Sequence, residues 1–143
     1  MRLKDVMTRN PESVSPDTSV FAAAGKMKSL DVGFLPVCDG PKILGVATDR
    51  DIVLRSVAEG RDPQSTAIRD VMSEGVETLP EDADVEEAAQ LMEREQIRRV
   101  VVTDGDGKCV GIVSLGDLAV KTHDDARCGD VLEEVSEPAS PRR

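Results

Sequence analysis

The sequence predicts a mixed α/β (α+β) fold made of two copies of one β-α-β-β-α unit. Asp5-Val6-Met7-Thr8 returns 65 residues later as Asp70-Val71-Met72-Ser73. One residue is then inserted in the second copy, after which Gly45–Asp51 aligns with Gly111–Asp117. Self-similarity over most of a 143-residue chain indicates that two small units together form the protein, since one copy alone is too short to be comfortably stable.

The elements of the first copy follow from its apolar periodicity. Pro16-Asp17-Thr18 is typical of a helix start, and apolar residues then recur at helical spacing at Val20, Ala23, Ala24 and Met27. Residues 34–38 and 43–47 are short apolar runs on either side of an Asp-Gly-Pro-Lys turn, which predicts a hairpin. A second helix is expected over 49–59, with Gly60 at its C-terminal cap.

The second copy has the same order of elements. Asp82 corresponds to Asp17 ahead of a helix over 85–92, and strands are expected over 100–103 and 109–113. A shorter helix over 115–121 closes this copy. We therefore expect repeats at 1–60 and 61–122, followed by a tail at 123–143. The tail is acidic, then rich in Pro, Ser and Arg, and we expect its end to be disordered.

Composition excludes several classes of function. The net charge is −10, and residues 61–143 carry 20 of the 28 acidic side chains, which disfavours nucleic-acid binding. The three cysteines have no CxxC spacing, which favours reduced thiols in a cytoplasmic protein, although a Cys38–Cys109 disulfide or a redox role is the alternative. No apolar run is long enough for a membrane span, and no signal sequence opens the chain. The single histidine, His123, offers neither a catalytic triad nor a zinc site, so we predict no catalytic residues and no metal site.

The most informative candidate site is Thr48-Asp49-Arg50-Asp51, at a predicted strand-to-helix junction. A helix N-terminus favours a phosphate, and a hydroxyl at the junction can bind the same phosphate. An acid three residues later faces the same side and can accept hydrogen bonds from a ribose diol. Ser114 and Asp117 repeat the hydroxyl and the acid in the second copy. Together these groups suit a nucleoside phosphate, with Arg50 as an additional cation.

The same spacing has a purely structural interpretation. Thr-x-x-Asp is close to a capping box, in which the hydroxyl caps the helix and the acid reaches back to the cap's N–H. This interpretation needs no ligand, and spacing alone favours it, but a capping residue can also contact a ligand. Gly33-Phe34-Leu35-Pro36 suits a shallow slot for a base or simple core packing, and Arg98-Arg99 suits a cleft-facing cation or a solvated pair.

At this point the residues resemble a known family. The repeated Asp-Val-Met-Thr/Ser start, the Phe34–Asp39 strand and the Gly45–Asp51 signature are similar to those of tandem CBS domains, the Bateman module. The resemblance covers roughly residues 3–121 and is strongest to small stand-alone bacterial CBS-pair proteins of the mycobacterial hypoxic response protein type. It implies two repeats packed sheet to sheet about a pseudo-twofold axis, with adenosine ligands in clefts between them and often a homodimer.

The resemblance also implies which residues contact the ligand. For the first site these are Val14, Ser15, Gly33, Phe34, Pro36, Thr48, Arg50 and Asp51. For the second, weaker site they are Thr78, Leu79, Arg98, Arg99, Val101, Ser114 and Asp117. In the second copy Val101 replaces the proline, and Leu115-Gly116 replaces Asp49-Arg50, so we expect the first site to bind better.

The sequence thus predicts a non-enzymatic regulatory module that binds an adenosine nucleotide (AMP, ADP, ATP or S-adenosylmethionine) and signals to a target protein. No obligatory cofactor is expected. The alternative is a ligand-free interaction module, in a stress or hypoxia response, whose signatures are only helix caps.

Overall fold

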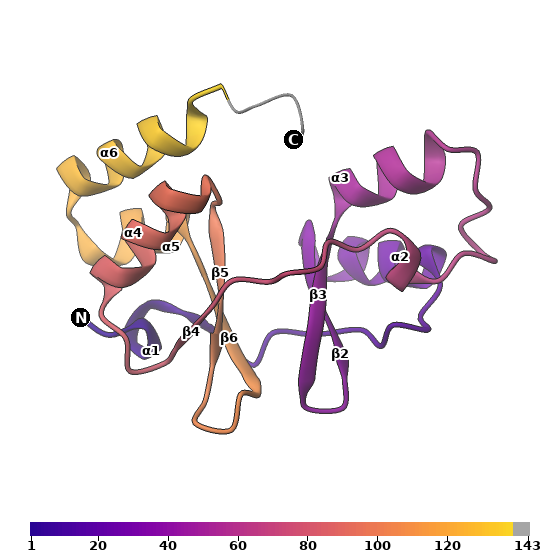
Figure 1. Ribbon diagram of the computed structural model, residues 1–143, viewed down its shortest axis with the longest axis horizontal. Helices are drawn as coiled ribbons and strands as arrows, with labels where there is room; N and C mark the ends of the chain where they lie inside the picture. Colours follow the sequence, from indigo (N-terminus) through magenta and orange to yellow (C-terminus); the bar gives the residue numbers. More distant parts are fainter. Residues whose placement is uncertain (139–143) are drawn as a thin grey trace. The chain divides into compact units, whose positions relative to one another are not determined.

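The computed structural model describes residues 1–138 and has the mixed α/β class that the sequence predicts (Figure 1). The chain forms two compact units. We name Pro11–Val76 the first-repeat unit, and Met1–Asn10 together with the chain from Glu77 onward the second-repeat unit. Disorder was predicted for residues 138–143, of which residues 139–143 lie outside the described residues.

The first-repeat unit is a two-stranded antiparallel hairpin with helices beside it. Its helices begin and end close to the predicted positions. The N-cap of the helix Val20–Leu30 is Ser19, which follows the Pro16-Asp17-Thr18 turn and accepts a 3.0 Å hydrogen bond from the Ala22 amide. The predicted helix over 49–59 forms as one turn of α-helix followed by a π-helical turn. The elements are α2 (Val20–Leu30), β2 (Phe34–Asp39), β3 (Lys42–Thr48), α3 (Asp49–Ile52), the π-helix η1 (Val53–Val57) and the 3-10 helix η2 (Ile68–Asp70).

The second-repeat unit has a four-stranded sheet in the order β1-β6-β5-β4, in which only the β4–β5 pair is parallel. Asp84, rather than Asp82, caps its long helix through a capping box with Glu87. The elements are α1 (Leu3–Val6), β1 (Thr8–Arg9), β4 (Thr78–Pro80), α4 (Val85–Glu95), β5 (Arg99–Thr103), β6 (Cys109–Ser114), α5 (Leu115–Thr122) and α6 (Asp125–Ser136).

Helix α6 was not predicted from the sequence, in which no periodic pattern was recognised after residue 122. Asp124 caps it by accepting a 3.1 Å bond from the Arg127 amide. Val131 and Val135 are buried in the core of the second-repeat unit, and α6 lies against α4 and α5 (Figure 1). The periodicity had been overlooked because charged residues separate the few apolar positions.

The two compact units exchange the opening segments of the sequence repeats. Thr8, from the start of the chain, pairs with Ile112 in the sheet of the second-repeat unit. Ser73, the equivalent residue of the other copy, exchanges two backbone hydrogen bonds with Val46 of the first-repeat unit, at 3.0 and 2.8 Å. The division at residue 60 therefore describes the sequence repeats, whereas each compact unit takes its Asp-Val-Met segment from the other copy.

A glycine in each unit permits this close approach. A Cβ placed on Gly45 would lie 2.5 Å from the carbonyl oxygen of Ser73. A Cβ placed on Gly111, the equivalent residue, would overlap the Met7 side chain and lie 3.1 Å from the carbonyl oxygen of Thr8. Real Cβ atoms do not approach backbone oxygens as closely as at Gly45, so a side chain there would push the exchanged segment away.

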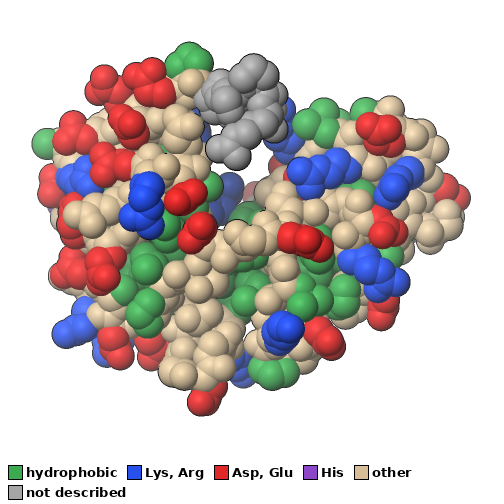
Figure 2. Space-filling model, in the orientation of Figure 1, with side chains coloured by type: hydrophobic (Ala, Val, Ile, Leu, Met, Phe, Trp, Pro, Cys, Tyr) green, Lys and Arg blue, Asp and Glu red, His purple; other side chains and the backbone are tan. Residues whose placement is uncertain are grey.

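Each unit has its own cluster of buried apolar side chains. Val20, Leu35 and Ile68 are central in the first-repeat unit, and Leu3 and Met92 in the second. In residues 1–138 no helix is both long and apolar enough to cross a bilayer. Acidic side chains gather on the face of the second-repeat unit shown in Figure 2, in line with the charge distribution of the sequence.

Candidate functional site

The Thr48–Asp51 signature forms a complete capping box where β3 meets α3. The Thr48 hydroxyl accepts a bond from the Asp51 amide at 3.0 Å, and the Asp51 carboxylate accepts one from the Thr48 amide at 3.0 Å. Asp51 is only 9% exposed. The purely structural interpretation of this spacing is therefore realised in the structure, and the acid offers a ligand only a small accessible surface.

Asp51 also connects the helix start to the exchanged segment. Its two carboxylate oxygens each lie 3.4 Å from the Ser73 hydroxyl, which donates to them, and Oδ1 lies 3.6 Å from Nη1 of Arg55. The same Arg55 nitrogen donates to the carbonyl oxygens of Val71 and Met72, both at 3.0 Å. These carbonyls follow the 3-10 helix η2, where backbone acceptors lack helical partners.

The second-repeat unit repeats this arrangement. Ser114 and Asp117 form a capping box with bonds of 3.0 and 2.9 Å. Lys121, in the position equivalent to Arg55, lies 3.5 Å from the Asp117 carboxylate and donates to the Val6 carbonyl at 2.8 Å. In both units a cation one turn after the acid thus links the signature to the exchanged Asp-Val-Met segment.

The structure brings most residues of the predicted first site together within the first-repeat unit. Phe34 is opposite Thr48 in the β2–β3 register, and the Asp49 amide donates to the Gly33 carbonyl at 3.0 Å. Val14 donates to the Pro36 carbonyl at 3.0 Å, and both side chains are buried. Their contribution to the site is therefore mainly to shape it.

Two further residues of the predicted first site lie at its surface. Ser15 is exposed and its hydroxyl lies 3.1 Å from that of Thr18, while Arg50 is exposed on the first turn of α3. Both side chains are therefore accessible from solvent.

Five of the seven residues of the predicted second site lie on adjacent strands of the other sheet, whereas Arg98 precedes β5 and Asp117 lies in α5. Thr78 and Val101 are partners in the parallel β4–β5 register, with Leu79 next in line, and Arg99 is opposite Ser114 across β5 and β6. Val101 is 1% exposed, so a ligand could reach little of its side chain.

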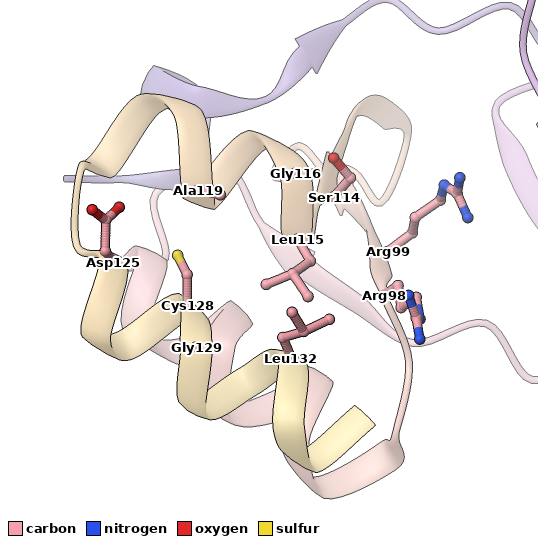
Figure 3. A pocket seen from close by; sticks show the side chains of 10 residues that line it. All are labelled: Arg98, Arg99, Ser114, Leu115, Gly116, Ala119, Asp125, Cys128, Gly129 and Leu132. Atoms are coloured by element: carbon pink, nitrogen blue, oxygen red, sulfur yellow. The ribbon is translucent and has the colours of Figure 1, made fainter. Parts of the chain in front are cut away.

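A pocket of about 660 Å³ opens in this unit, beside the start of α5 (Figure 3). Three of the predicted second-site residues line it: Arg98, Arg99 and Ser114. From the sequence, Arg98-Arg99 suited either a solvated pair or a pair with one member facing the cleft. In the structure both residues are exposed and both line this pocket. The other lining residues come from α5 and α6: Leu115, Gly116, Ala119, Asp125, Cys128, Gly129 and Leu132.

The four α6 residues of this pocket were not anticipated. The apolar residues Cys128, Val131, Leu132 and Val135 have the spacing of one helix face, and this signal could have found them. Within the described part of the chain, no group of three or more His, Cys, Asp or Glu side chains is placed to hold a metal ion. His123 is exposed and ends α5 in a left-handed conformation.

Two copies of one β-α-β-β-α unit, each with a hydroxyl-and-acid signature at a strand-to-helix junction, define a tandem-repeat α/β module. The sequence profile of the CBS domain matches residues 3–57 and again 68–123. The chain belongs to the CBS-domain family, in agreement with the resemblance stated above.

Relatives of similar length support this assignment. "Uncharacterized protein YlbB" of Bacillus subtilis is 41% identical over 138 residues, covering 95% of this chain and 92% of that protein. "Hypoxic response protein 1" of Mycobacterium tuberculosis is 33% identical over 117 residues, covering 81% of each chain.

Solved structures show the same fold. The CBS domain protein TA0289 of Thermoplasma acidophilum has a TM-score of 0.83 at 28% identity, covering 99% of this chain and 82% of that one. CBSX2 in complex with AMP has a TM-score of 0.74 at 28% identity. The CBS pair of MJ0100, in complex with 5′-methylthioadenosine and S-adenosyl-L-methionine, has a TM-score of 0.77 at 26% identity. For each of these last two structures, the match covers 87% of this chain and 98% of the other chain.

Proposed function

We propose that this protein is a non-enzymatic regulatory module that binds an adenosine ligand such as AMP, ADP, ATP or S-adenosylmethionine and signals to a target protein. The observation that carries the proposal is that the hydroxyl-and-acid signature is built twice with the same hydrogen bonds. The complexes of CBSX2 with AMP and of MJ0100 with S-adenosyl-L-methionine support this ligand class.

In the first-repeat unit, the proposed roles follow from the chemistry of each side chain and from its position near the start of α3 or on β2. The Thr48 hydroxyl and the exposed Arg50 guanidinium would contact a phosphate, and the Asp51 carboxylate would accept from a ribose diol. Gly33, Phe34 and Pro36, with Val14 and Ser15, would border the base. That the ligand lies between the repeats stays a prediction.

In the second-repeat unit, Ser114 and Asp117 would take the phosphate and ribose roles. The cations would be Arg98 and Arg99, and Thr78, Leu79 and Val101 would lie beside the base. We still expect weaker binding of a polyanionic ligand here, because this unit carries most of the acidic excess.

The experiment is thermal melting against AMP, ADP, ATP and S-adenosylmethionine, with wild type and Asp51→Ala compared. A ligand that binds only the folded state raises the melting temperature, and at one hundred times its Kd contributes about 2.7 kcal/mol. We expect a saturable rise for the wild type, and a loss of that rise in Asp51→Ala.

Because Asp51→Ala also removes a capping bond, a matched control is needed. Glu87 occupies the equivalent position of the Asp84 capping box on α4 and accepts the Asp84 amide at 2.9 Å, but it belongs to neither proposed site. Glu87→Ala should lower the melting temperature and leave the ligand-induced rise intact. An equal rise in wild type and Asp51→Ala would contradict the ribose role.

A second candidate function is a ligand-free interaction module, and one observation favours it. Asp51 is already paired with the Thr48 amide, Ser73 and Arg55, so its geometry is explained without a ligand. This candidate predicts no rise in melting temperature with any of the four ligands at millimolar concentration.

The proposal also covers the location, the oligomeric state and the cellular role of the protein. We propose a cytoplasmic homodimer that takes part in a stress response, by analogy with the relative named hypoxic response protein. Sedimentation of the purified protein tests the dimer.

A further inference from the structure

The pocket of the second-repeat unit has a wall that lies outside both CBS matches. The second match ends at residue 123, and α6 begins at Asp125. Nevertheless α6 supplies Asp125, Cys128, Gly129 and Leu132 to the pocket lining. In Figure 3, Leu132 on α6 and Leu115 on α5 point toward each other across it. A ligand in this pocket would therefore touch a helix that the CBS repeat itself does not contain.

Helix α6 is held firmly on its other side. Arg127 donates three hydrogen bonds to the Glu86 carboxylate, at 2.8 to 3.0 Å, and one to Glu93 at 2.5 Å. Val131 and Val135 are buried beneath the helix. Because ion pair and apolar contacts both fix α6 to its own unit, the pocket wall is pre-formed, which lowers the entropic cost of binding.

Two glycines keep the pocket open. A Cβ placed on Gly129 would meet no atom within 4 Å, and one placed on Gly116 would meet only the Ser114 hydroxyl, at 3.5 Å. Glycine inside a helix is destabilising relative to alanine, and α6 places one in its second turn. No close packing contact requires a glycine at residue 129, so its effect there is to leave space.

The lining has an apolar part, a cationic part and one carboxylate, that of Asp125, which lies away from the two arginines in Figure 3. Leu115, Ala119 and Leu132 supply aliphatic surface, while Arg98 and Arg99 come from the chain at the start of β5. Both arginines lie on the same side of the pocket in Figure 3, where the Arg99 side chain extends away from α5 and α6. Pockets that combine apolar walls with a few placed charges select ligands by orientation as well as by size.

The geometry points to a binding site for an apolar small molecule that carries an anionic group, with its apolar body beside Leu115, Ala119 and Leu132 and its anion at Arg98 and Arg99. The inference rests on the proposed function only in sharing Arg98, Arg99 and Ser114 with the second adenosine site. It adds that α6, a helix outside the CBS matches, contacts the occupant.

The test uses 8-anilino-1-naphthalenesulfonate, a flat aromatic sulfonate whose fluorescence rises in apolar surroundings. We expect saturable one-to-one binding to the full chain. Gly129→Leu should fill the pocket and weaken binding by at least about tenfold, the effect of losing one well-placed contact of 1.4 kcal/mol. Arg98→Gln should weaken it by about tenfold as well, through the lost charge-assisted bond.

The matched control is Asp130→Leu, which adds the same side chain at the adjacent exposed residue of α6, outside the pocket lining. It should bind the probe as the wild type does. Since leucine is a better helix former than glycine or aspartate, neither α6 variant should fail to fold. Far-ultraviolet circular dichroism verifies this.

Equal probe binding by wild type and Gly129→Leu, or equal losses in Gly129→Leu and Asp130→Leu, would overturn the inference. These outcomes are independent of the proposed function, because the probe is not a nucleotide. The proposed function fails separately, when no adenosine ligand stabilises the protein.

Discussion

Replacing Gly45 by alanine tests whether the exchanged segment really lies against β3. The added Cβ would be 2.5 Å from the Ser73 carbonyl oxygen and 3.1 Å from the Met72 sulfur. The oxygen belongs to backbone that is paired with Val46 in both directions, so it cannot move without breaking those bonds.

The magnitude follows from two contributions. Overpacking of a well-packed site costs about 1–3 kcal/mol. Displacing Ser73 weakens two backbone hydrogen bonds, each with a net contribution of about 1 kcal/mol. We therefore expect Gly45→Ala to lower the free energy of unfolding by about 2–4 kcal/mol. Gly111→Ala should cost less, because the nearest atom there belongs to the flexible Met7 side chain.

Urea unfolding followed by far-ultraviolet circular dichroism is the assay, since the chain has no Trp or Tyr for fluorescence. Gly25→Ala is the control: it lies inside α2, its added Cβ would meet nothing within 4 Å, and it should stabilise by about 0.5–1 kcal/mol. If Gly45→Ala changed the stability by less than about 0.5 kcal/mol, the normal range for surface substitutions, the close approach described here would be refuted.

Three further predictions concern the caps, the ion pair of α6 and a thiol. Thr48→Ala and Ser114→Ala should each cost about 1 kcal/mol in urea unfolding, because each hydroxyl accepts a capping bond at 3.0 Å. Hydrogen bonding to Arg127 holds the pKa of Glu93 below its ordinary value. The stability gained from the Arg127–Glu93 pair is therefore fully present above the ordinary glutamate pKa of about 4.3 and is lost as the pH falls through the lower pKa of the folded state. Arg127→Met should accordingly destabilise the protein at pH 7 more than at pH 3, and equal losses at both would contradict this. Burial raises the pKa of the Cys38 thiol, so iodoacetamide at pH 8 should alkylate it more slowly than a cysteine in a short peptide.

Much of the fold could be predicted from the sequence because the sequence contains two copies of one unit. The hairpin over β2 and β3 followed from two apolar runs around a Gly-Pro turn, and the junction at Thr48 followed from a strand pattern that meets a helix start. The sequence predicted the starts of the two long helices near Pro16-Asp17-Thr18 and after Asp82, but it did not identify Ser19 and Asp84 as their caps. Several polar residues near each start can cap a helix, and only the backbone geometry decides which does.

Two features could not be predicted in this way. The exchange of Asp5–Thr8 and Asp70–Ser73 between units leaves the order of elements unchanged, so a repeat pattern is compatible with either arrangement. Helix α6 depends on tertiary contacts, since its apolar residues are few and its anchor, Arg127, pairs with acids 41 and 34 residues earlier. Stability that comes from packing rather than from local propensity leaves a weak signal in sequence.

The same exchange explains why the signature acid is difficult to interpret from sequence alone. An acid that only capped α3 would need no cation, yet Asp51 is followed one turn later by Arg55 and Asp117 by Lys121. Each cation satisfies carbonyl oxygens of the exchanged segment, and each acid offsets the cation's charge. Removing Asp51 would therefore weaken the cap, the contact with Ser73 and the placement of Arg55 together. Loss of ligand binding in Asp51→Ala must therefore be compared with the result for Glu87→Ala. That variant also loses a capping acid, but it leaves the exchanged segment of the first-repeat unit unchanged.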